Sequence, residues 1–137
     1  MPRRAHTLRI PGQTSELERV RRHVEDWAGE AGLSPKETRQ LRTAVDEAVA
    51  NAIEHGLDDQ RDHITIRSAS DASGLAVTVR HRGDRFDPTL PPVPLAEARE
   101  ARAVHGYGLH LLKTLVDSLS YRFVRGANEV RLYKRKR

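Results

Sequence analysis

One amphipathic helix between residues 41 and 57 constrains this chain more than any other stretch. In LRTAVDEAVANAIEHGL, apolar residues recur every three or four positions and form a broad arc, as a helix packed against a sheet requires. The other side carries a narrow ridge of acids and one amide: Glu47, Asn51, Glu54 and Asp58. A solvated helix usually mixes lysine or arginine into such a ridge, whereas acids and amides are typical of metal binding or proton transfer. The ridge alone is equally consistent with an exposed acidic face.

Composition bounds the class of protein. The chain of 137 residues, 37% of them hydrophobic, suffices for one domain with one core. It has no cysteine, no apolar run long enough to span a membrane and no apolar leader, so we expect a cytoplasmic protein. The net charge is +5 and the isoelectric point is near 10.1, but much of the excess lies at the two ends of the chain. We interpret residues 134–137 as a solubilising basic tail and expect no direct contact with nucleic acid or membrane.

The remaining patterns predict an α+β domain. Residues of alternating polarity predict strands at 5–10, 63–70, 75–82, 119–125 and 129–134, the last four forming two hairpins. Helical spacing predicts helices from Thr14 or Ser15 to Ala31, from a capping box of Ser34 with Glu37 to Gly56, and after Gly108. This order predicts about three helices on one face of a mixed or largely antiparallel sheet of about five strands. Residues 88–105 have little core-forming content and are predicted to form a lid.

Four blocks stand in a fixed order along the chain. They are EAVANAIEHG at 47–56, HRGDRFDP at 81–88, GYGL at 106–109 and VRLYK at 130–134. In that order they resemble the N-box, the first glycine block, the second glycine block and the closing strand of the GHKL, or Bergerat-fold, ATPases. Among these, the chain resembles the bacterial anti-sigma-factor serine/threonine kinases. Each block is weak alone, but their joint order and spacing cover nearly the whole chain and argue against chance.

The resemblance implies a single Bergerat-fold domain over residues 1–137 that binds ATP and Mg²⁺. It implies that Glu47 is the general base toward the attacking hydroxyl and that Asn51 holds Mg²⁺ against the triphosphate. Residues four apart lie on one face of a helix, which agrees with both roles. An amide oxygen also suits a hard cation that keeps most of its waters and phosphate ligands.

The same resemblance implies further nucleotide-binding residues. Gly106 and Gly108 would cradle phosphate beneath the lid, because glycines that open a helix let backbone amides approach an anion. Gly83 would let the chain pass close beneath the adenine. The matching blocks add four more nucleotide-binding candidates: His55, Phe86, Tyr107 and Leu109.

Two positions depart from the family pattern at the adenine end. His81 stands where the family has the aspartate that accepts a hydrogen bond from the adenine amino group, and Glu129 stands where it usually has a threonine. A neutral histidine can still accept through one nitrogen, although its ring is larger and its protonation depends on pH. We keep both residues as nucleotide-binding candidates and hypothesise that they pair across the pocket floor and occlude it. The alternative is that one or both side chains turn aside and ATP still binds.

The resemblance implies a regulatory kinase of the anti-sigma type. Such a kinase uses Mg-ATP to phosphorylate a serine or threonine of a small antagonist protein, and it alternates between that antagonist and a sigma factor. His81 and Glu129 favour an alternative function, a non-enzymatic binding module with a degenerate adenine pocket in the same partner-switching pathway. Family members often dimerise through the sheet and the first helix, and the sequence leaves a homodimer open.

Overall fold

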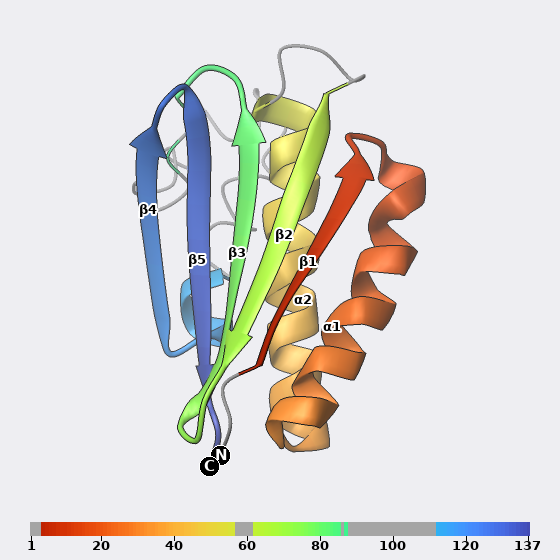
Figure 1. Ribbon diagram of the computed structural model, residues 1–137, viewed down its shortest axis with the longest axis vertical. Coiled ribbons are helices and arrows are strands. Elements are labelled where there is room, and N and C mark those ends of the chain that lie inside the picture. The colour runs from red at the N-terminus through yellow and green to blue at the C-terminus, as the bar shows by residue number, and fades with distance from the viewer. Residues whose placement is uncertain (1–3, 57–61, 86, 88–111) are drawn as a thin grey trace, which may run out of the picture.

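The computed structural model describes residues 4–56, 62–85, 87 and 112–137. Its strands form one five-stranded sheet in the order β1-β2-β3-β5-β4, with two long helices behind it (Figure 1). The strands are β1 (Arg4–Pro11), β2 (His63–Ser70), β3 (Gly74–Arg82), β4 (Ser118–Val124) and β5 (Ala127–Arg135). The helical segments are η1 (Thr14–Glu16), α1 (Leu17–Ala31), α2 (Pro35–Asn51) and the π-helical η2 (Ala52–Gly56).

The predicted α+β architecture is confirmed. Helices cover one face of a five-stranded sheet, and both predicted hairpins form, as β2 with β3 and β4 with β5. All four strand pairings are antiparallel, so the mixed sheet that the sequence allowed does not form. Residues 112–115, the described part of the third predicted helix, are helical. The predicted lid at 88–105 lies outside the described residues.

A single apolar core fills the space between the sheet and the helices. Alternate residues of each strand point to opposite faces, and the inward set of β2, β3 and β5 is fully or nearly fully buried. The apolar arc predicted for residues 41–53 faces them. Its members Leu41, Ala44, Val45, Ala48 and Val49 on α2 and Ala52 on η2 are buried, and Ile53 on η2 is partly buried against the same core. Leu112 joins the same core from the third helix. Burial of this apolar surface drives the helices onto one face of the sheet.

Two local signals fix where α1 ends and α2 begins. Gly32 follows α1 with a φ of +83°, a left-handed conformation in which the Leu33 amide donates to the Ala28 carbonyl at 3.0 Å. The predicted capping box is confirmed. The Glu37 amide donates to the Ser34 hydroxyl at 3.1 Å, and the Ser34 amide donates to the Glu37 carboxylate at 2.8 Å. These caps define the end of α1 and the start of α2. Asn51 lies at the opposite end of α2 from its cap.

The prediction of a basic tail over residues 134–137 is wrong for Lys134 and Arg135, because β5 continues to Arg135. Lys134 is 5% exposed, and its Nζ donates to the Leu115 carbonyl at 2.9 Å. Leu115 ends the third helix, and the last carbonyls of a helix lack partners within it. The Lys134 side chain reaches from β5 and bonds one of these carbonyls. The Arg137 amide donates to Glu37 at 3.0 Å, and its guanidinium pairs with Asp117. The chain end is thus bound to the N-terminus of α2 and to the start of β4.

These contacts predict a stability that falls at acid pH. Hydrogen bonds from Arg137 and from the Arg135 amide hold the pKa of Asp117 below its usual value, and hydrogen bonds from Ser34 and Arg137 do the same for the pKa of Glu37. A lowered folded-state pKa stabilises the fold above the unfolded value, and that contribution disappears as the pH falls through the folded-state pKa. We expect the melting temperature of the wild type to decrease with pH once the pH is lower than about 4.5. In Asp117→Asn the melting temperature should decrease less steeply over the same pH range.

The control for this experiment is Asp26→Asn, which changes an exposed carboxylate on α1. Melting temperatures followed by circular dichroism between neutral and strongly acid pH should give the same acid slope for this variant as for the wild type. An unchanged acid slope in Asp117→Asn would contradict the role assigned to the C-terminal contacts.

Candidate functional site

Three elements end together at one end of the molecule, the upper end in Figure 1. They are the C-terminus of α2, the C-terminus of β3 and the N-terminus of β5, and α2 packs on both strands. The segment η2, which continues α2, contacts β3. Asn51, His81 and Asn128 sit on these three ends, and they are 2%, 4% and 0% exposed. Buried polar groups are costly without hydrogen bonds, so their concentration at one end of an apolar core marks a candidate site.

The acidic ridge of α2 contributes Glu47 and Asn51 to this end. Glu47 is half-buried, and Asn51 is the last residue of α2, immediately before η2. Residues one turn apart share a face of the helix, and the adjacent residues Ala48 and Val49 are buried in the core. The structure therefore places a carboxylate and an amide one helical turn apart at the end of α2.

A second group of polar residues closes the site from the sheet. The β3–β5 register places Asn128 directly opposite His81, and both face the helices. The Tyr121 hydroxyl donates to the Asn128 side-chain oxygen, and the Asn128 amide donates to the Asp84 carbonyl at 2.9 Å. Gly83, between His81 and that carbonyl, has a φ of +146°, a conformation essentially confined to glycine. The turn after β3 is therefore bonded to β5 and, through Tyr121, to β4.

The hypothesis that His81 pairs with Glu129 is wrong. Glu129 lies opposite Arg80 in the register, and its carboxylate forms ion pairs with Arg80 at 3.2 Å and with Arg122. Successive residues of a strand point to opposite faces, so Glu129 lies on the sheet face away from α2 while His81 lies on the near face. The residue that the sequence reasoning missed is Asn128. It shares the alternation of Val130 and Leu132, which would have placed it inward.

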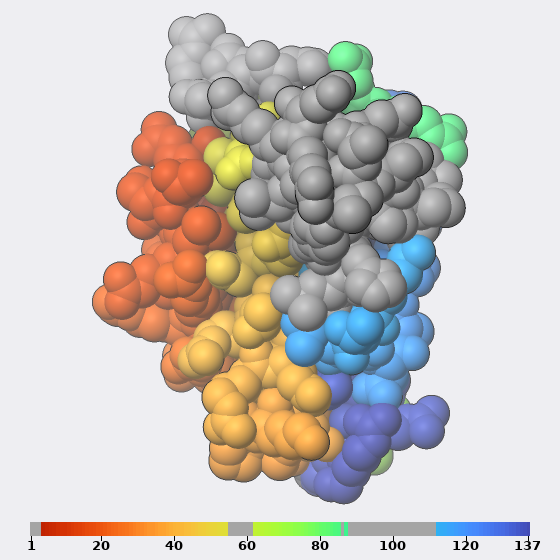
Figure 2. Space-filling model, turned by 180° about the vertical axis from the view of Figure 1, so that it is seen from behind, coloured from red at the N-terminus to blue at the C-terminus, as the bar shows by residue number. Residues whose placement is uncertain are grey.

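The remaining predicted site residues fall wholly or partly outside the described residues. His55 belongs to η2 by its backbone, and its side chain is outside that part of the chain. The others are Phe86, Gly106, Tyr107, Gly108 and Leu109. The phosphate cradle and the lid therefore stay predictions. Figure 2 shows the helix side of the molecule, with α1 and α2 adjoining and residues from 112 onward beside α2.

The fold and this arrangement of residues define a class of protein. The family described as the histidine kinase-like ATPase domain matches residues 10–134, and the chain belongs to it. The resemblance to the GHKL ATPases is thereby confirmed. Among the described residues, no helix has the length and apolar character needed to cross a membrane.

Relatives within this family carry a more specific name. The chain is 28% identical over 130 residues to the serine-protein kinase RsbW of Listeria monocytogenes, a match covering 90% of this chain and 83% of the relative. It is 28% identical over 118 residues to RsbW of Bacillus subtilis, covering 82% and 74%. The crystal structure of the RsbU and RsbW domains of Rv1364c from Mycobacterium tuberculosis shares the fold, with a TM-score of 0.66 at 21% identity. That match covers 95% of this chain and 32% of the other.

Proposed function

We propose that this chain is a single-domain anti-sigma-type serine/threonine kinase of the cytoplasm. It binds Mg-ATP at the upper end of the fold, phosphorylates a hydroxyl of a small antagonist protein and sequesters a sigma factor. The observation that carries the proposal is the placement of Glu47 and Asn51 on one face of α2, at the end where His81 and Asn128 are buried. The relatives named serine-protein kinases support a hydroxyl as the acceptor.

The donor set fits magnesium bound together with a nucleotide. Within the described residues, no group of three or more histidine, aspartate or glutamate side chains converges on a possible metal position. Mg²⁺ is usually held by one or two protein oxygens, with waters and substrate phosphates completing its octahedron. The Asn51 amide oxygen would be such a ligand, and its burial places it where water is largely excluded. When bound, the metal neutralises the charge that develops on the transferred phosphoryl group.

The protein side of the reaction requires positioning and one proton transfer. Glu47, one turn before Asn51 on α2, receives the proton of the attacking hydroxyl at a carboxylate oxygen. Its half-buried position leaves one side open to an incoming acceptor protein. The packed face of α2, from Leu41 to Val49, holds Glu47 and Asn51 in place, so the helix supplies the alignment that phosphoryl transfer needs.

The adenine end favours a second candidate function, the non-enzymatic binding module. His81, whose ring is larger than the aspartate of the family pattern, is 4% exposed and is packed at this end opposite the fully buried Asn128. In the kinase, a neutral His81 would accept a hydrogen bond from the adenine amino group. In the binding module, the packed side chains would leave too little room for a nucleotide. Under either function, the chain would still bind its partner proteins.

Nucleotide titration and a transfer assay separate the two functions. We expect wild type to bind Mg-ATP in calorimetry and to phosphorylate its antagonist, and His81→Asp to bind about tenfold more tightly, because a carboxylate accepts a stronger hydrogen bond. His63→Asp, the same change at an exposed position of β2, is the control and should match wild type. A wild type that neither binds nor transfers would assign the binding module. Phosphate transfer by His81→Asp but not by the wild type would also assign the binding module to the wild-type chain.

A further inference from the structure

The sheet face turned away from α1 and α2 is strongly basic. It faces the viewer in Figure 1, and no described helix lies over it. Six exposed arginines occupy its outward positions: Arg9, Arg67, Arg82, Arg122, Arg131 and Arg135. With half-buried Arg80 and the single acid Glu129, these strand positions have a net formal charge of +6, more than the +5 of the whole chain. We call these outward strand positions the arginine face.

The arginines follow the register of the sheet. One row across the five strands reads, from β1 to β4, Arg9, Thr65, Arg80, Glu129 and Arg122. The next row reads Thr7, Arg67, Thr78, Arg131 and Ser120. In the second row the arginines stand two strands apart, about 9.5 Å, with a threonine between them. Hydroxyl groups and guanidinium groups therefore alternate along this row.

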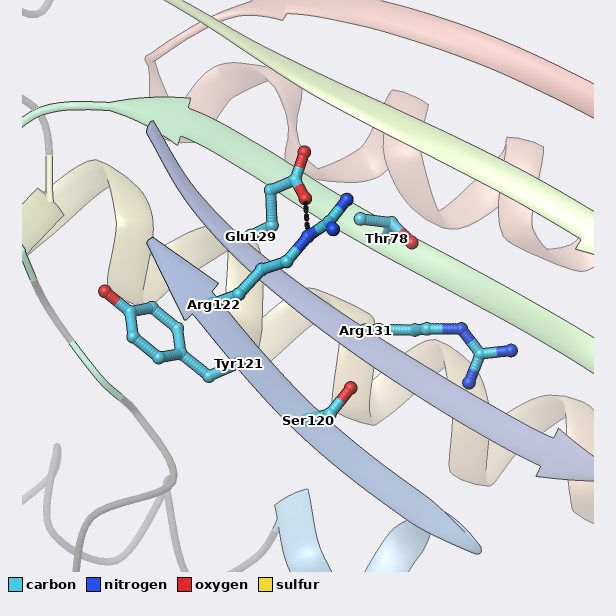
Figure 3. Close-up of a pocket in the computed structure, with 6 residues that line it drawn as sticks. All are labelled: Thr78, Ser120, Tyr121, Arg122, Glu129 and Arg131. Carbon is cyan, nitrogen blue, oxygen red and sulfur yellow. Dashed lines mark hydrogen bonds and ion pairs between the residues drawn. The ribbon is translucent and has the colours of Figure 1, made fainter. Parts of the chain in front are cut away.

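The only acid of these rows is already neutralised within the protein. Arg80 and Arg122 both pair with the Glu129 carboxylate, which is 12% exposed. Figure 3 shows the Arg122 side chain reaching from β4 toward Glu129, beside a groove of about 470 Å³ that Arg131, Thr78 and Ser120 also line. In the part of the chain that the structure describes, Arg9, Arg67 and Arg131 form no ion pair, and the Arg131 guanidinium lies 5.7 Å from the centre of the Tyr133 ring. A ligand on this face therefore meets positive charge and hydroxyl groups.

We propose that the arginine face docks an acidic protein surface. Its basic residues are all arginines, with no lysine, and they lie next to Tyr133. Protein interfaces are enriched in arginine and tyrosine and depleted in lysine. The planar guanidinium binds carboxylates bidentately, and the hydroxyls between the arginines accept or donate further hydrogen bonds.

Two other occupants fit this face less well. A second copy docked symmetrically would bring arginines onto arginines, which costs free energy because like charges repel. A single-stranded nucleic acid needs successive aromatic platforms, and the outward strand positions hold one tyrosine, Tyr133, and no phenylalanine or tryptophan. The acidic protein thus fits the charge and the side-chain types together.

The docked protein would leave the nucleotide end accessible. The arginine face and the ridge with Glu47 and Asn51 lie on opposite sides of the sheet. Docking on the arginine face is therefore independent of phosphate transfer, and binding can be measured without nucleotide.

The test is binding of a fluorescein-labelled peptide of alternating glutamate and serine, followed by fluorescence anisotropy. We expect wild type to bind it and the affinity to fall from low to physiological ionic strength. Arg67→Gln with Arg131→Gln should weaken binding roughly fivefold. The matched control is Arg22→Gln with Arg39→Gln, the same charge change on exposed helix positions, and it should bind as wild type does. Arg9→Gln with Arg135→Gln provides a second test pair on the arginine face.

Four results would overturn the proposal. The first is no peptide binding, and the second is equal weakening by the control pair and both test pairs. Tighter binding of duplex DNA than of the peptide, with the same sensitivity to the test pairs, would assign the face to nucleic acid. A dimer in light scattering that dissociates in both test pairs would assign it to a second copy.

Discussion

Replacing Glu47 by glutamine should slow phosphate transfer by orders of magnitude and leave Mg-ATP binding close to that of wild type. Glutamine keeps the shape of the side chain on α2 but cannot accept a proton from the attacking hydroxyl. General-base catalysis contributes typically about 10²- to 10⁴-fold to a rate, so we expect a loss in that range in single-turnover transfer to the antagonist protein. Calorimetric titration with Mg-ATP measures binding in the same preparation.

The control is Glu18→Gln, which makes the same change at an exposed position of α1. It should transfer phosphate at the wild-type rate. If Glu47→Gln transferred phosphate at the wild-type rate as well, the base would lie elsewhere. Lost binding in Glu47→Gln would show instead that the carboxylate organises the nucleotide site.

The sequence was sufficient for the elements whose signals are local. The spacing of Leu41, Val45 and Val49 predicted the buried face of α2, and the capping box predicted where it begins. Alternation over residues 63–70 and 75–82 predicted a hairpin that forms with nearly the same bounds. These signals work because helices and short hairpins are specified by residues close together in the chain.

The sequence was insufficient where one residue of register decides the outcome. Turn residues Arg125 and Gly126 set the start of β5, and a shift of one position exchanges Glu129 for Asn128 on the face toward α2. The contact of Arg137 with Glu37 joins residues one hundred positions apart, and composition alone showed only a basic chain end. The arginine face likewise became visible only when the register aligned residues from all five strands.

Replacing Asn51 by alanine should remove the dependence of nucleotide binding on magnesium. The amide oxygen is the protein ligand that the donor set offers to Mg²⁺, and hydrogen bonds or ligand bonds to charged groups contribute about 1.5–3 kcal/mol each. We therefore expect Mg-ATP affinity to fall roughly 10- to 100-fold, with transfer falling at least as far. In EDTA, wild type and variant should bind ATP alike, because neither then uses the metal.

The change at Asn51 should leave the fold intact, which makes the magnesium effect interpretable. Alanine is a better helix former than asparagine, and the buried neighbours Ala48 and Val49 keep α2 on the sheet. Gln40→Ala, an amide removed from an earlier turn of α2, is the matched control and should keep wild-type Mg-ATP affinity. Equal losses in EDTA and in magnesium would mean that Asn51 supports the shape of the pocket and does not bind the metal. In that case α2 would retain its candidate base, and the magnesium ligand would have to come from another part of the chain.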